Sequence, residues 1–325
     1  MNLARRRFLR LAGSIATLPA LAGGAAAETY PSRPVKLIVG LPAGGAPDIY
    51  ARLIADWLSE RLRQPFVVEN RPGASGNIAT EAVIRAAPDG HTLLMVIAPN
   101  VINPTLYPHL KFNFIHDTTP VASIGGSPFI MVVNPSVPAK TVPEFIAYAK
   151  SNPGKINVAV TDLGSVTRMA AELFKMMAGV DLVIVPHAGE TAALTDLLSN
   201  QVQVMFDPIP SALGYVRNGQ LRALGVTAAK PSASFPGVPP VAQFLPGYEA
   251  IGVTGIVAPR GTPADTVATL NTAINAALAD PKIKERFAAL GTTTRTSSPV
   301  EFGAIIASET EKWAKVIKFA KIKTE

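Results

Sequence analysis

Short apolar runs alternate along the chain with glycine- and proline-rich loops and with segments of helical periodicity. The run Val35–Val39 is typical of a buried strand, and the loop after it leads into residues 49–62, whose apolar positions recur at helical spacing. The same order continues with a strand at Phe66–Asn70, a helix at 78–87 and a strand at 92–98. Strands that alternate with helices in this way predict a parallel sheet with helices on its faces.

The middle of the chain repeats this order and predicts a second α/β unit. Two strands are expected first, at 121–124 and 129–133, and Thr141 with Glu144 forms a capping box for the next helix. The remaining strands and helices of this unit are expected at 156–160, 168–178, 182–185, 191–199, 202–206, 209–217 and 221–227. Segments 124–133 and 224–227 are the candidates for crossings between the two units.

A strand at 251–258 and helices that begin near Pro263 and Pro299 complete the chain. The last helix is rich in lysine, which favours its C-terminal end electrostatically. A solvated helix face explains these lysines, and a surface for an acidic partner or a membrane is the alternative.

The amino-acid composition excludes several classes of function. The chain has 325 residues, which favours two domains, and 48% of them are hydrophobic, which is enough for sizeable cores. It contains no cysteine, so disulfides, thiolate metal sites and cysteine nucleophiles are excluded. Its four histidines show no metal-ligand spacing, and we expect neither a metal nor a cofactor.

The N-terminal segment has the three parts of an export signal. Arginines at positions 5–7 and 10 form a basic start, and residues 11–22 are apolar but far shorter than the roughly 20 residues of a membrane span. The paired arginines resemble a twin-arginine signal, although Ala4 stands where Ser or Thr is usual, and a Sec signal is the alternative. We expect cleavage between Ala27 and Glu28, which removes residues 1–27 and leaves a periplasmic protein.

The charge balance changes once this segment is removed. Without its four arginines the net charge falls from +7 to +3, and no later cluster of basic and aromatic residues is present. We therefore expect no nucleic-acid partner. No later apolar run is long enough for a membrane span.

Loops between a strand and a helix are the candidate binding elements. The free amides at a helix N-terminus, together with the helix dipole, attract an anion without any basic side chain. Three loops have this character, at 42–48, 163–167 and 186–191, and they would meet across a cleft if the two units face each other. The first loop lacks the glycine spacing of a dinucleotide cradle, and Asp48 is interpreted as a helix-capping group.

Catalytic motifs are weak by comparison. Ser165 and Ser211 lack the glycine-flanked elbow of a serine hydrolase. His187 enters a glycine loop and is a candidate general base, but spacing assigns it no nucleophile or paired carboxylate. We therefore assign no catalytic residue, and a periplasmic hydrolase that uses His187 with a serine is kept as a rival hypothesis.

Several motifs together resemble one family. They are Tyr30-Pro31-Ser32-Arg33-Pro34, the loop Pro42-Ala43-Gly44-Gly45-Ala46-Pro47-Asp48, the run Val67-Val68-Glu69-Asn70-Arg71-Pro72-Gly73-Ala74, the turn Pro88-Asp89-Gly90 and the segment Ala258-Pro259-Arg260-Gly261-Thr262-Pro263. They resemble the Bug family, the extracytoplasmic solute receptors of tripartite tricarboxylate transporters. The resemblance extends over the whole chain after Glu28.

The resemblance implies an α/β fold of the type II-like periplasmic binding protein class. Two α/β domains would enclose a central ligand cleft and be hinged by two crossing strands, with 28–126 and 226–325 in one domain and 127–225 in the other. It implies a non-enzymatic, monomeric receptor that binds a small organic acid and delivers it to the membrane components of the transporter. A receptor that senses a ligand for a signalling partner is the alternative.

The resemblance also implies the ligand contacts. A carboxylate would be held by backbone amides, hydroxyls and water from the facing loops. The residues implied are Gly44, Gly45, Ala46, Pro47, Asp48, Ala98, Gly164, Ser165, Val166, Thr167, Arg168, His187, Ala188, Gly189 and Asp207.

Some of these positions depart from the family pattern. Pro47 replaces a hydroxyl residue, Arg168 replaces a histidine, and His187 and Ala188 replace a tyrosine and a basic residue. We expect a ligand unlike those of better-known members. Arg168 is interpreted either as a fork for a second carboxylate or as a solvent-facing helix arginine with a buried stem.

Overall fold

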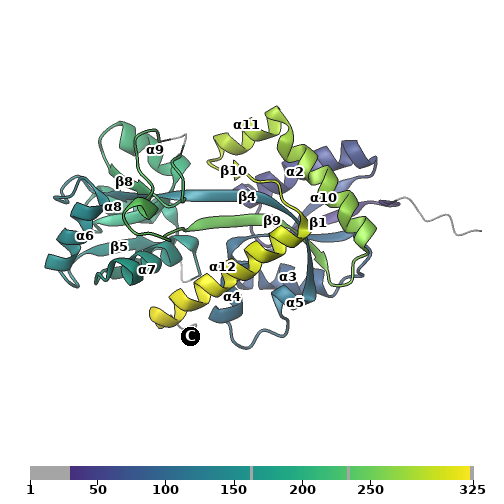
Figure 1. Ribbon diagram of the computed structural model, residues 1–325, viewed down its shortest axis with the longest axis horizontal. Helices are drawn as coiled ribbons and strands as arrows, with labels where there is room; N and C mark the ends of the chain where they lie inside the picture. The colour runs from purple at the N-terminus through teal and green to yellow at the C-terminus, as the bar shows by residue number, and fades with distance from the viewer. Residues whose placement is uncertain (1–29, 162–163, 233–234, 323–325) are drawn as a thin grey trace, which may run out of the picture.

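Two lobes, each with a sheet between layers of helices, are joined by long strands (Figure 1). The computed structural model describes residues 30–161, 164–232 and 235–322. The predicted export signal lies outside the described residues. Within them, the strands form one sheet of ten, in which the central strands run from one lobe into the other.

The first lobe begins with the predicted parallel strands. β1 (Val35–Val39) pairs in parallel with both β2 (Phe66–Asn70) and β3 (Thr92–Val96). The helices that connect or follow these strands are α2 (Ala46–Leu62), the short 3-10 helix η1 (Ala74–Gly76), α3 (Asn77–Ile84), α4 (Ala98–Leu106) and α5 (Phe114–Asp117). The predicted third strand is two residues shorter than expected, because Ala98 begins α4.

Helix α2 forms because its apolar positions recur at intervals of four residues. Tyr50, Ile54 and Leu58 lie on one face and are buried in the cluster that α2 shares with β1, β2 and α10. The helix ends at Arg63, which adopts a left-handed conformation. Gly45 and Pro47 stand at its start, so the helix N-terminus lies at the carboxyl end of β1.

The prediction of two strands at 121–124 and 129–133 was wrong. A single strand, β4 (Thr118–Val133), runs through both segments. Gly125 and Gly126, which lie between the two predicted segments, pair with the short strand β10 (Thr293–Thr294). A Cβ atom at Gly125 would collide with the carbonyl oxygen of Thr293, so the glycine allows close approach of β10 and does not end the strand.

The second lobe is built on the far half of β4. β7 (Val204–Pro208) and β8 (Arg222–Val226) pair with it in antiparallel fashion, while β5 (Asn157–Val160) and β6 (Val183–Pro186) extend the sheet in parallel. The helices of this lobe are α6 (Val142–Ser151), α7 (Val166–Ala178), α8 (Glu190–Leu198) and α9 (Ile209–Arg217).

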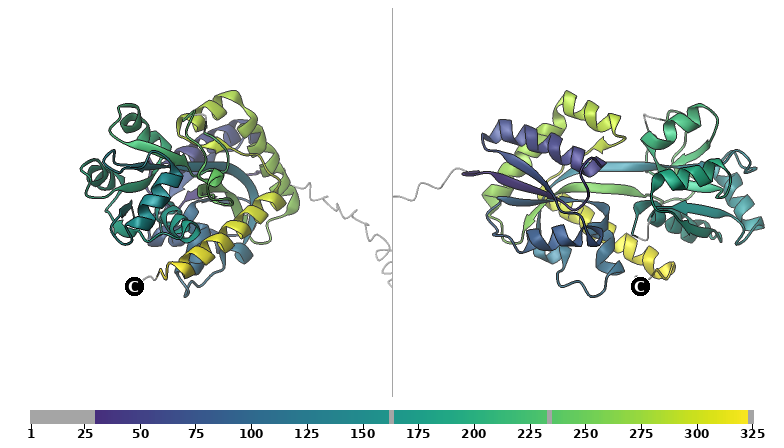
Figure 2. Two further views of the ribbon diagram at one scale, coloured as in Figure 1. Left: turned by 60° about the vertical axis from the view of Figure 1, so that its left-hand side comes forward. Right: turned by 180° about the vertical axis from the view of Figure 1, so that it is seen from behind.

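The chain returns to the first lobe after β8. The predicted crossing at 224–227 lies inside the second lobe, and after the short 3-10 helix η2 (Val241–Gln243) the strand β9 (Ile251–Pro259) runs back. β9 pairs with β3 on one side and with β4 on the other, so β4 and β9 together span both lobes (Figure 2). The helices that follow are α10 (Ala264–Ala279), α11 (Pro281–Ala289) and α12 (Pro299–Phe319).

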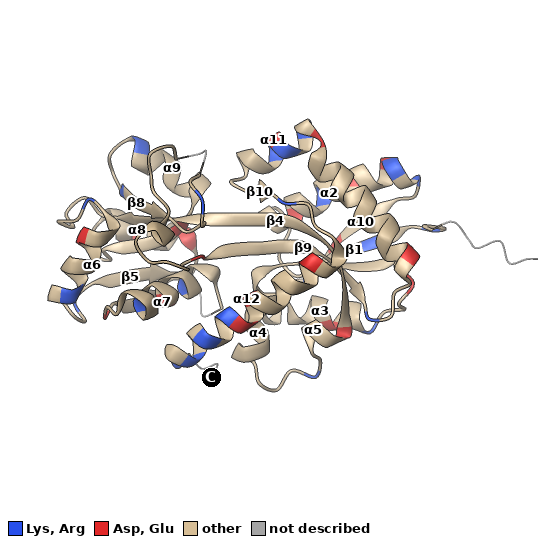
Figure 3. Ribbon diagram, viewed as in Figure 1, with Lys and Arg blue, Asp and Glu red and all other residues tan. Residues whose placement is uncertain are grey.

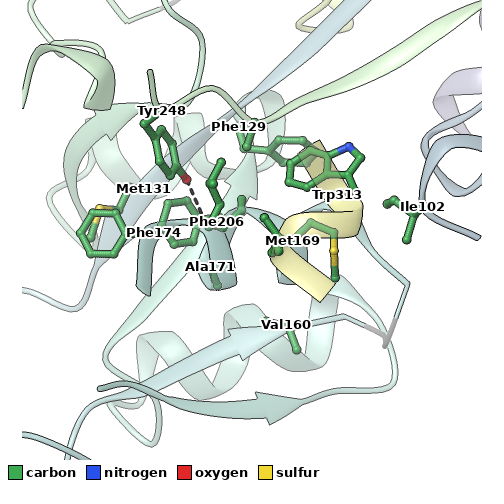
Figure 4. Packing of buried hydrophobic residues seen from close by; sticks show 14 of the residues in the cluster. Ile102, Phe129, Met131, Val160, Met169, Ala171, Phe174, Phe206, Tyr248 and Trp313 are labelled. Carbon is green, nitrogen blue, oxygen red and sulfur yellow. Dashed lines mark hydrogen bonds between the residues drawn. The ribbon is translucent and has the colours of Figure 1, made fainter. Parts of the chain in front are cut away.

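One buried cluster extends under both lobes. It joins Ile102 of α4 to Phe174 and Phe206 of the second lobe, and Trp313 of α12 lies between them (Figure 4). The Tyr248 hydroxyl donates a hydrogen bond of 3.0 Å to the carbonyl of Ala170 within this cluster. The last helix therefore packs against both lobes, although it belongs to the first by chain order.

The contact between β9 and α12 gives a test of this packing. A Cβ atom at Gly255 would lie 2.6 Å from the carbonyl oxygen of Ala122 and 2.7 Å from a ring carbon of Phe302. We expect Gly255→Ala to lower the free energy of unfolding by about 1–3 kcal/mol, because overpacking forces side chains or backbone to shift.

Gly252→Ala is the matched control, since its Cβ would lie 3.7 Å from the nearest atom, the carbonyl oxygen of Ser127, in the same strand. This variant is expected to stay within about 0.5 kcal/mol of the parent in urea unfolding. Equal unfolding midpoints for the two variants would contradict the proposed packing.

Candidate functional site

A cavity of about 440 Å³ lies between the lobes where the crossing strands pass from one to the other. Its described lining comes from the ends of first-lobe strands, from the crossing strands, from second-lobe helix starts and from the turn after α11. These segments are 46–47, 97–99, 127–129, 252–254, 208–211 and 289–291, together with Leu41, Tyr50 and Glu190.

Four helices begin at this cavity. In the first lobe, α2 and α4 present Ala46 and Ala98, and in the second lobe α8 and α9 present Glu190 and Ile209. No side chain caps the first amides of α2, α8 or α9. The N-terminal ends of four helices therefore border one space, and three of them lack a side-chain cap. The positive ends of their dipoles make this a favourable environment for an anion.

The side chains of the described lining are mostly apolar, with a few hydroxyl groups, and none of them is positively charged. The lining includes no Lys, Arg or His, and Glu190 is the charged residue within it. The crossing strands β4 and β9 contain no charged residue, as Figure 3 shows. Any attraction for an anion at this part of the structure comes from the backbone.

Hydroxyl groups fix one wall of the cavity. The Thr292 hydroxyl lies 2.6 Å from the Ser127 hydroxyl and also bonds to the Tyr50 hydroxyl. The three residues come from the loop before β10, from β4 and from α2, so the bonds tie these elements together beside the hinge. Tyr50 is buried and turns its hydroxyl toward this cluster.

The lobes touch at one edge of the cavity. A Cβ atom at Gly291, after α11, would lie 2.9 Å from the Pro210 ring in α9. Gly291 has a φ of 74°, a conformation that favours glycine. The absence of a side chain thus lets the first-lobe backbone at Gly291 pack directly against the Pro210 ring of the second lobe.

Asp207 is a buried acid beside the cavity. It is the second-last residue of β7, immediately before the lining segment that begins at Pro208. It is fully inaccessible to solvent, and neither carboxyl oxygen has a hydrogen-bond partner among the described residues. Burial, with a smaller contribution from the negative charge of Glu190, raises the pKa of Asp207 to about 8. The carboxyl is therefore mostly protonated at neutral pH.

The first predicted loop reaches the cavity in part. Ala46, Pro47 and Ala98 line it, whereas Gly44 and Gly45 stand just before the helix start. Asp48 is turned inward: its carboxylate accepts a 2.9 Å bond from the Gly44 amide and is paired with Arg52. Burial opposes ionisation, but these hydrogen bonds outweigh it and hold the pKa of Asp48 below its usual range.

The second predicted loop lies off the described wall of the cavity. The Ser165 hydroxyl caps α7 by accepting a 3.2 Å bond from the Arg168 amide, and Thr167 lies 2.9 Å from it. Arg168 is mostly buried, with its Nε 3.9 Å from the carboxylate of Glu172. Gly164 and Val166 belong to the same turn. None of the residues 164–168 is among the described lining of the cavity.

Most of the third predicted loop also lies outside the described lining of the cavity. His187 Nδ1 lies 2.9 Å from the Val185 carbonyl oxygen, and Nε2 lies 2.9 Å from Asp196. Both ring nitrogens are therefore engaged within the second lobe. Ala188 and Gly189 precede Glu190, which is the point where this loop reaches the cavity.

A family comparison decides the identity of the chain. Residues 50–322 match the family described as "Tripartite tricarboxylate transporter family receptor". The chain belongs to this family. It is similar to Protein BugT of Bordetella pertussis, with 35% identity over 315 residues, 96% of this chain and 97% of that protein. The predicted resemblance to the Bug family is confirmed.

Solved structures of family members share the fold. Rpa4515 of R. palustris with adipate is 34% identical, with a TM-score of 0.76 over 90% of this chain and 99% of that one. MatC of Rhodopseudomonas palustris with bound malate is also 34% identical, with a TM-score of 0.72 over 89% of this chain and 100% of that one. The predicted type II-like periplasmic binding protein fold, with two α/β domains hinged by crossing strands, is confirmed. No described helix has the length and apolar character needed to cross a bilayer.

Several lining residues of this family member were missed by the sequence analysis. They are Tyr50, Ser127, Phe129, Ser211, Thr254 and Leu290. Segment 208–211 carries a usable signal, because it joins a predicted strand directly to a predicted helix. Leu290 lies in the turn after α11, and the others lie within strands or helices, where their sequence pattern indicates only burial.

The buried carboxyl of Asp207 gives a test by pH. Between about pH 4 and pH 8 the unfolded chain releases this proton while the folded chain keeps it, so rising pH destabilises the parent. We expect the stability of Asp207→Asn relative to the parent to increase over this range, by at most about 1.4 kcal/mol per pH unit.

Urea unfolding at several pH values measures the difference. Asp56→Asn, at an exposed position of α2, is the control and should follow the parent at every pH. A parallel pH dependence for Asp207→Asn and the parent would show that the carboxyl ionises normally in the folded state.

Proposed function

We propose that this chain is an extracytoplasmic receptor that captures a small carboxylate in the cavity between its lobes. It would then deliver the ligand to the membrane components of a tripartite tricarboxylate transporter. The family match and the adipate and malate named for two related structures support this proposal.

The observation that carries the proposal is the convergence of helix N-termini. Starts of α2 and α4 from one lobe and of α8 and α9 from the other face a cavity whose described lining has no cationic side chain. Backbone amides in a partly desolvated space bind a carboxylate strongly, because the low local dielectric strengthens each hydrogen bond.

Closure of the lobes completes the site in this proposal. The carboxylate first meets the loop with Gly44, Gly45, Ala46 and Pro47 and the start of α4 at Ala98. Rotation about β4 and β9 then brings the second-lobe loops, with Ser165, Thr167 and Gly189, toward the ligand. The closed form is selected by the ligand and presents the surface that the membrane partner recognises.

The proposed receptor is monomeric, non-catalytic and free of cofactors. We assign residues 1–27 to the export signal and the rest of the chain to two domains. The boundary expected at 225/226 falls inside β8, so we place the return to the first domain at β9, which begins at Ile251. Both nitrogens of His187 have partners within the second lobe, which disfavours the rival hydrolase hypothesis, because a general base needs one nitrogen for its substrate.

Matched ligands test the capture of a carboxylate. We expect titration calorimetry to detect at least one acid in a panel of small carboxylic acids, and to detect no binding of its carboxamide. The amide keeps the shape of the acid but lacks the charge that the helix N-termini attract. Binding of carboxamides or neutral sugars without any acid would refute the proposal.

A blocked cavity tests the location. Ala98→Phe, at the start of α4, is expected to weaken acid binding by at least about tenfold, because the ring occupies the space between the lobes. Ala304→Phe, on the exposed side of α12, is the control and should bind like the parent. Unchanged binding by Ala98→Phe would show that the acid binds outside this cavity.

A further inference from the structure

We propose that the ligand is a monocarboxylate with an apolar body, held with its carboxylate toward the first lobe and its carbon end toward the second. Glu190, at the start of α8, would exclude a second carboxylate. This inference rests on the proposed function and narrows its ligand class.

The two lobes offer unequal anion sites. The first turn of α4 contains no acidic residue, and Asp48 in the first turn of α2 is already paired with Arg52. In the second lobe, α8 begins with Glu190, and Asp207 directly precedes the start of α9. The negative charge of Glu190 offsets the positive end of α8, whereas Asp207 is mostly protonated and adds a buried neutral acid beside α9. A carboxylate is therefore better accommodated in the first lobe.

Proline reduces the donors of the second lobe further. Pro208 and Pro210 occupy the start of α9, and neither has a backbone N–H. Pro47 and Pro99 remove one amide each from α2 and α4. Helix α9 thus has fewer amides to offer a carboxylate than α2.

The lining between these helix ends suits a hydrocarbon. Phe129, Pro208, Ile209 and Leu290 form the part of the wall that belongs to or faces the second lobe. Each methylene group buried against such a surface strengthens binding about fourfold. A charged end placed there would lose its water without gaining a cationic partner, since the described lining contains none.

The environment of Asp207 shows that the region near α8 and α9 disfavours a negative charge. Asp207 is fully buried, and its oxygens have no partner among the described residues. Its pKa is raised, first by burial and then by Glu190. A second ligand carboxylate near α8 and α9 would meet the same burial and the same neighbouring acid.

Matched acids test the inference by calorimetry on the full mature chain. The pairs are butanoate with succinate, hexanoate with adipate, octanoate with suberate and benzoate with terephthalate, and 6-aminohexanoate supplies a cationic end. We expect the tightest ligand to be a monocarboxylate that binds at least about tenfold more tightly than its dicarboxylate partner.

The outcomes separate the two proposals. A dicarboxylate or 6-aminohexanoate as the tightest ligand would overturn the inference while leaving a carboxylate receptor. Binding of no acid at all would overturn the proposed function and the inference with it.

A variant tests the assignment to Glu190. Glu190→Gln keeps the side-chain shape and removes the charge, so it should bring the affinity of each dicarboxylate closer to that of its monocarboxylate partner. Glu60→Gln, at an exposed position of α2, is the control and should keep the parent ratio. An unchanged ratio in Glu190→Gln would show that Glu190 does not exclude the second carboxylate.

Discussion

The hydrogen-bonded ladder between β4 and β9 is the constraint on which this structure depends. β4 pairs with strands of both lobes, and β9 runs beside it back into the first lobe, so the lobes are joined by one continuous sheet and not by a flexible linker. Parallel strands on each side end toward the same space, and the helices that follow them begin there. The position of the cavity is therefore a consequence of topology.

This topology explains how an anion site forms without basic side chains. A helix N-terminus carries partial positive charge that is fixed by the backbone and needs no reorganisation when a ligand arrives. Four such ends share the cavity, and the side chains between them are mostly carbon. Specificity then depends on the few polar groups that modify this field, above all Glu190, Asp207 and the prolines of the helix starts.

Local sequence patterns predict many of the helices and strands of the first lobe. The apolar run Val35–Val39, the glycine loop after it and the four-residue spacing of α2 are signals confined to short segments, and each predicts one element. The loop at Ala46 and Pro47 could be placed at the cavity for the same reason. Its neighbour Asp48 does not cap the helix as predicted: its carboxylate accepts the amide of Gly44, one residue before the N-cap Gly45.

Other features depend on contacts between distant segments. Gly125 and Gly126 have the composition of a turn, and only the approach of β10 from far along the chain explains why β4 continues through them. Ser165 has the composition of a ligand contact, but it serves as the cap of α7. The lining contributed by Leu290 and Gly291 arises because the turn after α11 folds back onto α9, which no local pattern encodes.

The long helix α12 adds a mechanical consequence. It starts in the first lobe and packs beside α7 of the second, with Trp313 and Ile317 in the shared core (Figures 1 and 4). A rotation of one lobe must slide this helix against one of its two supports. The position of the C-terminal end of α12 thus depends on the angle between the lobes. A fluorophore attached near this end would report changes in that angle without occupying the cavity.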